Sequence, residues 1–144
     1  MSTDADVASR HLSQVIHVDP DVVYAFASDV HNLPQWAAGL ANSSVAIHDD
    51  HLVVDSPMGG VTVRFVAVND FGVLDHDVTL PSGTTVNNPV RVIAHPDGAE
   101  VIFTVRQIEL TDEGFERDLQ TVGEDLARLK ACVESRWPAG VRSR

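Results

Sequence analysis

The feature that most constrains the fold is an apolar stripe near the end of the chain. Its side chains recur at alternating spacings of four and three residues, which is typical of one face of an α-helix. The stripe consists of Phe115, Leu119, Val122, Leu126, Leu129 and Val133. It predicts a helix over residues 113–135, about 35 Å long at roughly 1.5 Å per residue. Thr111 or Asp112 can cap its start.

The stripe would also suit a coiled-coil seam, but it covers only about three heptads. The preceding part of the chain, from residue 43 to 110, alternates apolar and polar residues between short turns, which is typical of half-buried strands. Such short turns require antiparallel pairing, and Pro89 indicates a bulge or an edge inside one of these runs. The apolar face of such a sheet must be buried against another element, so we predict that the helix packs against it.

Two short helices are expected before the sheet. A first strand over residues 12–18 ends at Asp19-Pro20, where aspartate can cap a helix and proline can open it. We place one helix near residues 20–28. A second start at residues 32–34 predicts another near 32–40, with Trp36 and Leu40 as its apolar anchors.

Composition limits the class of protein. A chain of 144 residues is expected to form one domain, structured over about 10–136 with flexible termini. The net charge of −11 disfavours nucleic acid and anionic membranes as partners. The single cysteine, Cys132, excludes an internal disulfide, and the polar start of the chain has no signal-peptide or membrane-span pattern. We therefore expect a cytoplasmic protein, a monomer or homodimer without membrane insertion.

The order of these elements resembles the START/polyketide-cyclase (SRPBCC) superfamily. The segments that carry the resemblance are VIHVDPDVVYAFASDVHNLPQW, NDFGVLDHDV, NPVRVI, AEVIFTV and FERDLQTVGEDLARLKACVES. The resemblance implies an α+β helix-grip fold, in which a curved antiparallel sheet wraps around the long C-terminal helix. It also implies that the two short helices close one end and leave a cavity between sheet and helix.

Strand parity places three polar side chains on the inner face of the sheet. His76 shares parity with Leu74 and Val78, Asn88 with Val86 and Val90, and Gln107 with Phe103. Turn lengths then predict a row across adjacent strands. The row runs through Phe65, His76, Asn88 and Gln107. It assumes a two-residue turn at Asp97-Gly98.

His76 has three possible roles. It can be a core residue hydrogen-bonded to Asn88, a group that orients a ligand, or a catalytic acid/base. The expected apolar walls of the cavity are Val63, Phe65, Val78, Val90, Phe103, Leu119, Val122 and Leu126. Trp36 is expected at the cavity mouth or as a core anchor. Gly123 is expected to admit a close sheet contact or to leave room for a ligand.

No other residue pattern indicates catalysis or a cofactor. His48 and His51 flank a hairpin turn without further metal ligands at suitable spacing, and Cys132 lies beside the apolar stripe as a packing residue. Phosphate-loop, dinucleotide and nucleophile-elbow motifs do not occur. We therefore expect no cofactor and no metal. Two function classes remain. The first is binding of a small hydrophobic or amphipathic molecule, lipid- or polyketide-like, in the cavity between the sheet and the C-terminal helix. The second is a polyketide cyclase, aromatase or dehydratase that uses His76 as acid/base.

Overall fold

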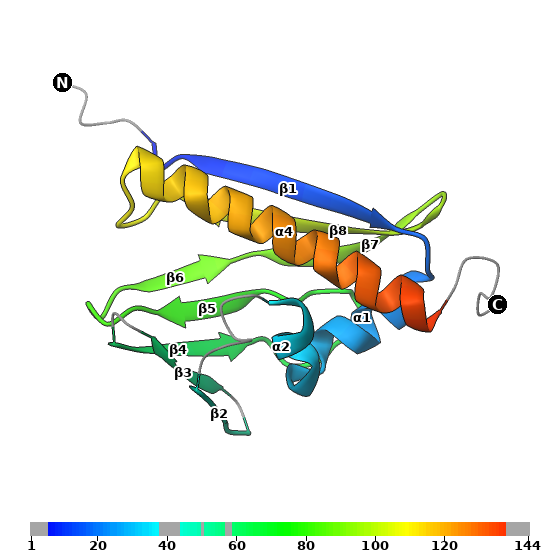
Figure 1. The fold of residues 1–144 in the computed structure, drawn as a ribbon, viewed down its shortest axis with the longest axis horizontal. Helices are drawn as coiled ribbons and strands as arrows, with labels where there is room; N and C mark the ends of the chain where they lie inside the picture. Colours follow the sequence, from blue (N-terminus) through cyan, green and yellow to red (C-terminus); the bar gives the residue numbers. More distant parts are fainter. Residues whose placement is uncertain (1–5, 38–43, 50, 57–58, 138–144) are drawn as a thin grey trace.

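A sheet and one long helix dominate the computed structural model of the chain, which describes residues 6–37, 44–49, 51–56 and 59–137 (Figure 1). The first strand, β1 (Ser9–Ile16), leads into α1 (Pro20–Ser28). A 3₁₀ turn, η2 (Val30–Asn32), and a one-turn helix, α2 (Leu33–Trp36), follow directly. The two predicted short helices are therefore present, although Leu40 lies outside the described residues.

The described strands form two antiparallel sheets. Five strands pair in the order β2-β3-β4-β5-β6, and a second sheet pairs in the order β1-β8-β7. The strands are β2 (Ser44–Ile47), β3 (Leu52–Ser56), β4 (Gly59–Phe65), β5 (His76–Thr79), β6 (Thr85–Asn88), β7 (Val90–His95) and β8 (Gly98–Arg106). All pairings between these named strands are antiparallel, as the short turns predict.

The two sheets meet at Pro89, where the sequence predicts a bulge or an edge. β6 ends one residue before this proline and β7 begins one residue after it. Residues 72–74 join the sheets, since the Val92 amide donates to the Gly72 carbonyl and the Leu74 amide to the Val90 carbonyl, both at 2.8 Å. Because proline has no amide hydrogen to donate to a strand partner, the hydrogen-bond ladder is interrupted at this position.

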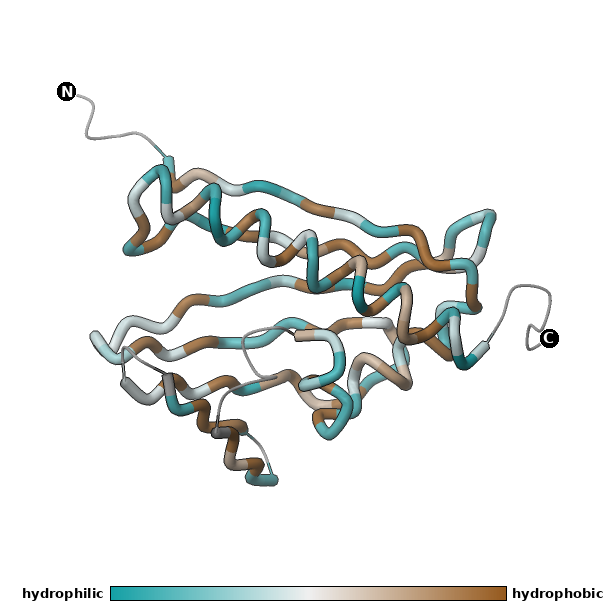
Figure 2. Tube along the Cα trace, viewed as in Figure 1, coloured by the Kyte–Doolittle hydropathy of each residue, from teal (hydrophilic) through white to brown (hydrophobic). Residues whose placement is uncertain are grey.

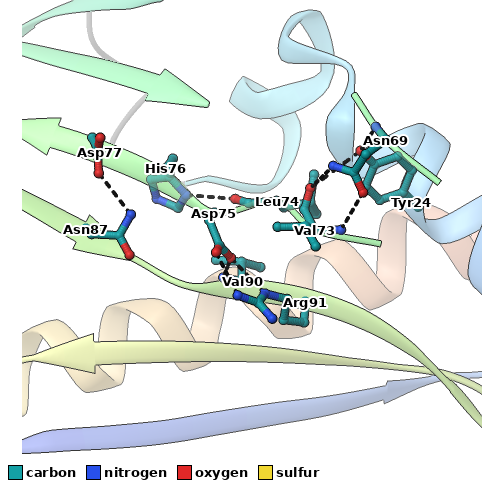
Figure 3. A network of polar contacts seen from close by, with 10 residues as sticks. All are labelled: Tyr24, Asn69, Val73, Leu74, Asp75, His76, Asp77, Asn87, Val90 and Arg91. Atoms are coloured by element: carbon teal, nitrogen blue, oxygen red, sulfur yellow. Dashed lines mark hydrogen bonds and ion pairs between the residues drawn. The ribbon is translucent and has the colours of Figure 1, made fainter. Parts of the chain in front are cut away.

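An ion pair clamps the same junction (Figure 3). The Asp75 carboxylate accepts hydrogen bonds from the Val90 amide at 2.8 Å and from Nε and Nη2 of Arg91 at 2.9 and 2.8 Å. The guanidinium of Arg91 lowers the pKa of the Asp75 carboxyl group, so this carboxylate stays charged at neutral pH. The bend between the sheets is therefore held by both backbone and side-chain bonds.

The long helix, α4 (Asp112–Arg136), confirms the predicted stripe. Thr111 caps its start by accepting a 3.0 Å hydrogen bond from the Gly114 amide. All six stripe residues are buried within the single chain, against the sheets and the short helices. Figure 2 shows the apolar positions of α4 alternating with hydrophilic ones along its length. None of the described helices combines the length and the hydropathy needed to cross a membrane.

The predicted register between β7 and β8 is wrong by two residues. His95 pairs with Gly98, so Pro96 and Asp97 form the turn, whereas the sequence placed the turn at Asp97-Gly98. Gly98 is a strand residue with φ of 140°, and a Cβ there would lie 2.5 Å from the Ile16 carbonyl oxygen. The positive φ and this close approach both require glycine.

Candidate functional site

A cavity of about 250 Å³ lies between the five-stranded sheet, α4 and the short helices. Its walls are mostly aliphatic and aromatic, with a single histidine among them. The lining residues are Ala27, Leu33, Trp36, Ala37, Leu52, Val63, Phe65, Leu74, His76, Val78, Val90, Phe103, Asp118, Thr121, Val122 and Asp125. The cavity is therefore where the sequence predicts it, between the sheet and the helix.

Eight residues predicted for the site line this cavity: Trp36, Val63, Phe65, His76, Val78, Val90, Phe103 and Val122. Five others predicted for it do not: Asn88, Gln107, Leu119, Gly123 and Leu126. The five residues lie away from the cavity for two reasons. One is the strand register of the sheet, and the other is the rotation of the helix.

The polar row is only partly formed. Phe65 pairs with His76, and His76 with Asn88, as predicted. The predicted pairing of Asn88 with Gln107 is wrong, because the β7–β8 turn lies elsewhere and the sheet breaks directly after Asn88. Gln107 follows β8, and its side-chain amide donates to the Leu110 carbonyl and to Asp112 at the start of α4. Gln107 is thus a helix-start residue and not part of the cavity wall.

The helix presents a different edge of its stripe to the cavity than predicted. At about 100° per residue, Leu119 and Leu126 lie on one edge of the stripe, and Val122 lies nearer the other. Leu119 borders a surface groove beside Arg10 of β1, while Leu126 is buried without reaching the cavity. A Cβ at Gly123 would meet no atom within 4 Å, so this glycine makes no close sheet contact.

Three polar residues of α4 line the cavity although the sequence pattern did not predict them. Asp118, Thr121 and Asp125 flank the stripe on the side of Val122. Their spacing of three, four and seven residues was the available signal, because it places them on one face of a helix next to Val122. Apolar lining residues from the short helices, such as Leu33, were likewise not predicted.

His76 is held in orientation by the backbone just before its strand (Figure 3). Its Nδ1 lies 3.1 Å from the Leu74 carbonyl oxygen. A carbonyl oxygen only accepts, so Nδ1 carries the proton and, in the neutral ring, Nε2 is a bare acceptor. The ring is also packed between aromatic neighbours, with centroids 4.7 Å from Phe65 and 5.8 Å from Phe103.

The surroundings of His76 keep its ring neutral. Burial lowers the pKa of His76, and it outweighs the opposing effects of the Leu74 hydrogen bond and of the flanking Asp75 and Asp77 carboxylates. An imidazole with a lowered pKa is uncharged at neutral pH. The sheet side of the cavity therefore presents a neutral, oriented hydrogen-bond acceptor among mostly apolar side chains.

The α4 wall of the cavity contributes two carboxylates. Asp125 accepts a 2.8 Å hydrogen bond from Arg128, whose Nε also donates to the Trp36 carbonyl at 3.2 Å. Removal from water and then the nearby charge of Asp125 raise the pKa of the Asp118 carboxyl group. The side chain of Asp118 still contacts solvent, which limits this effect. This side of the cavity therefore has two carboxylates, of which Asp125 is paired with the Arg128 cation.

Trp36 is both a core anchor and a cavity-lining residue. Its side chain is 8% exposed and belongs to the hydrophobic core. Its indole Nε1 is buried and has no hydrogen-bond partner within the described part of the chain. An unpaired buried N–H is uncommon and costs stability.

His48, His51 and Cys132 do not line the cavity. The rings of His48 and His51 stack with centroids 4.6 Å apart, but no cluster of three metal-ligating side chains occurs among the described residues. Cys132 is half-buried, and its Sγ lies 3.7 Å from the Gln35 carbonyl oxygen. It therefore packs α4 against α2.

Comparison with known proteins identifies the fold. No family model matches the chain, and no curated protein does. The structure of protein CV1439 from Chromobacterium violaceum is similar with a TM-score of 0.66 and 16% identity, over 88% of this chain and 97% of that one. The structure of XoxI from Bacillus cereus is similar with a TM-score of 0.67 and 15% identity, over 88% of this chain and 95% of that one. The structure of Ara h 8.0201 is similar with a TM-score of 0.64 and 11% identity, over 90% of this chain and 99% of that one.

Identities this low concern the fold alone. The shared features are an antiparallel sheet, two short helices after the first strand and a long C-terminal helix. The chain therefore has the helix-grip fold that the resemblance predicts.

Proposed function

We propose that this chain binds one small, largely apolar molecule in the cavity between the sheet and α4. The observation that carries the proposal is an apolar cavity of about 250 Å³ with one oriented, neutral histidine on its wall. Apolar walls with a few convergent polar groups are the usual form of a small-molecule site. Proteins of the helix-grip type commonly bind hydrophobic ligands, which supports the same conclusion.

The volume limits the size of this molecule. Cavities for drug-sized ligands are typically about 300–1,000 Å³, whereas an engineered cavity of about 150 Å³ in another protein binds benzene. A cavity of about 250 Å³ lies between these limits. It suits a molecule of about two fused rings or a short branched chain, smaller than a typical lipid.

Binding is tested by filling the cavity. Val78 is half-buried on the cavity wall, so Val78→Phe places a ring inside it. Val53→Phe is the matched control, because Val53 is half-buried on neighbouring β3 but is absent from the lining. We expect naphthalene to shift the NMR amide signals of cavity residues in the natural protein and in the control, but not in Val78→Phe. Equal shifts in all three proteins would exclude this cavity.

A second function is an enzyme of the polyketide cyclase, aromatase or dehydratase type. It is favoured by the neutral His76, which can accept a proton, and by the Asp118 carboxyl group on the same cavity. Under this alternative, replacing His76 would abolish turnover with little loss of ligand affinity. Under the binding function, the same change weakens or misorients the ligand.

The cellular setting is also a proposal. We propose a cytoplasmic monomer or homodimer of the START/polyketide-cyclase superfamily, without nucleic-acid partners. The acidic net charge of −11 and the single cysteine support this setting. Native mass spectrometry of the purified protein would measure its oligomeric state and detect a small molecule that co-purifies with it.

A further inference from the structure

We propose that the ligand is a neutral molecule with a hydroxyl group that donates a hydrogen bond to Nε2 of His76. This inference rests on the proposed binding function and names its ligand class. It separates alcohols and phenols from two other classes of apolar molecule, those whose polar group only accepts and those that carry a carboxylate.

The first step is the proton position on His76. The 3.1 Å contact to the Leu74 carbonyl places the proton on Nδ1, because two acceptors cannot form a hydrogen bond. Nε2 lies on the other side of the ring and has no partner among the described residues, and the residue lines the cavity. Only a donor satisfies this nitrogen. A ketone, ether or ester oxygen only accepts, so its lone pair would face the lone pair of Nε2 and no hydrogen bond would form.

The second step is the fixed orientation of the ring. Phe65 lies tilted by 33° against it, and Phe103 meets it edge-on at 74°. The Asp75 clamp holds the adjacent backbone on the outer side of the sheet. A ring flip that exchanged the two nitrogens would break the Leu74 hydrogen bond, so the acceptor is preorganised for its ligand.

Trp36 supplies the opposite hydrogen-bonding character. Its indole N–H is a buried donor without a partner in the described part of the chain, on a residue that also lines the cavity. A hydroxyl oxygen both donates and accepts. A ligand hydroxyl group therefore pairs with His76 as a donor, whereas a purely apolar ligand leaves its Nε2 nitrogen unpaired.

The charge around the cavity argues against an acidic ligand. Asp118 and Asp125 lie on the α4 wall, and the whole chain has a net charge of −11. A fatty acid or an aromatic carboxylate would bring its own negative charge beside these groups. Like charges at short range in a partly apolar site are unfavourable. The structure therefore favours an uncharged hydroxyl compound.

The test is a matched series of two-ring compounds at pH 7.5, followed by calorimetry or NMR titration. 2-Methylnaphthalene has nearly the shape of 2-naphthol but no hydrogen-bonding group, 2-methoxynaphthalene only accepts, and 2-naphthoate is charged. We expect 2-naphthol to bind roughly tenfold more tightly than the methyl and methoxy compounds, since it pairs an oriented acceptor on the cavity wall. We expect 2-naphthoate to bind least.

Variants assign the preference to His76. His76→Phe keeps an aromatic ring but removes the acceptor, so it should bind 2-naphthol and 2-methylnaphthalene equally. Asp77→Asn is the control, because Asp77 is exposed on the same strand and hydrogen-bonds Asn87 outside the cavity. In the natural protein, 2-naphthol should also shift the ¹⁵N resonance of His76 Nε2. This measurement needs no variant, so a misfolded His76→Phe protein would not leave the question open.

The two proposals fail differently. Binding of 2-methylnaphthalene without a preference for 2-naphthol would overturn the hydroxyl inference and leave the binding function intact. A 2-methoxynaphthalene affinity equal to that of 2-naphthol would also overturn the inference. Binding of none of the four compounds would overturn both.

Discussion

Gly123→Ala offers a sharp test of the helix assignment. Gly123 lies inside α4, and a Cβ built on it meets no atom within 4 Å. Glycine in a helix interior is about 0.5–1 kcal/mol less favourable than alanine, because it loses more backbone freedom on folding. With open space for the new methyl group, nearly all of this difference should appear as added stability. We expect a melting temperature roughly 1–4 °C higher for a chain of this size.

The assays are thermal and urea unfolding, with Gly114→Ala as the comparison. A Cβ at Gly114 would lie 3.3 Å from the Thr111 hydroxyl that caps the helix, so its gain should be smaller. Ligand affinity should not change in Gly123→Ala, because Gly123 does not line the cavity. A loss of stability would mean that another group packs over this position. A loss of affinity would return Gly123 to the ligand site, where the sequence placed it.

Three further predictions follow from burial and backbone geometry. Leu126→Ala should lower the free energy of unfolding by roughly 2–5 kcal/mol, measured by urea titration, since this side chain is only 2% exposed. An unchanged midpoint would contradict the assigned helix face. Gly98→Ala should strongly lower the yield of folded protein, because the new Cβ would lie 2.5 Å from the Ile16 carbonyl oxygen; a normal melting temperature would contradict this. Stability should fall as the pH drops below about 6.5, because the unfolded His76 ring takes up a proton there and the buried ring, with its lowered pKa, resists it. His76→Phe should flatten this pH dependence, and an unchanged slope would assign it to other groups.

Much of the fold could be predicted because local patterns and tertiary structure agree. The six apolar side chains of the α4 stripe recur with one consistent helical period, and all six are buried. The three-residue loop before Thr84 determined the register that places His76 beside Asn88, and the structure confirms this pairing. Short turns and long amphipathic helices carry their geometry in adjacent residues, so no distant contact is needed to interpret them.

The errors arose where distant segments determine the structure. Gly98 is required by its approach to Ile16, far away in the sequence, so the Asp97-Gly98 pair only resembled a hairpin turn. Likewise, the edge of α4 that faces the cavity depends on how the helix crosses the sheet. This crossing places Asp118 on the cavity and Leu119 beside β1, although the two residues are adjacent in sequence. The periodicity identifies which residues of α4 are buried, but it does not determine which edge of this buried stripe faces the cavity.

The break at Pro89 has a consequence for hydrogen exchange. Four of the six large side chains that are fully buried belong to the three-stranded sheet and α4, namely Ile16, Val101, Leu129 and Val133, while the other two are Val23 of α1 and Leu52 of β3. Among the described strand residues of the five-stranded sheet, only Leu52 and Val54 are buried. Amides of β1, β8 and α4 should thus exchange only through global unfolding, while β4 and β5 open at lower free energy. A cavity ligand would contact both units, so its binding would slow exchange chiefly in the less stable one.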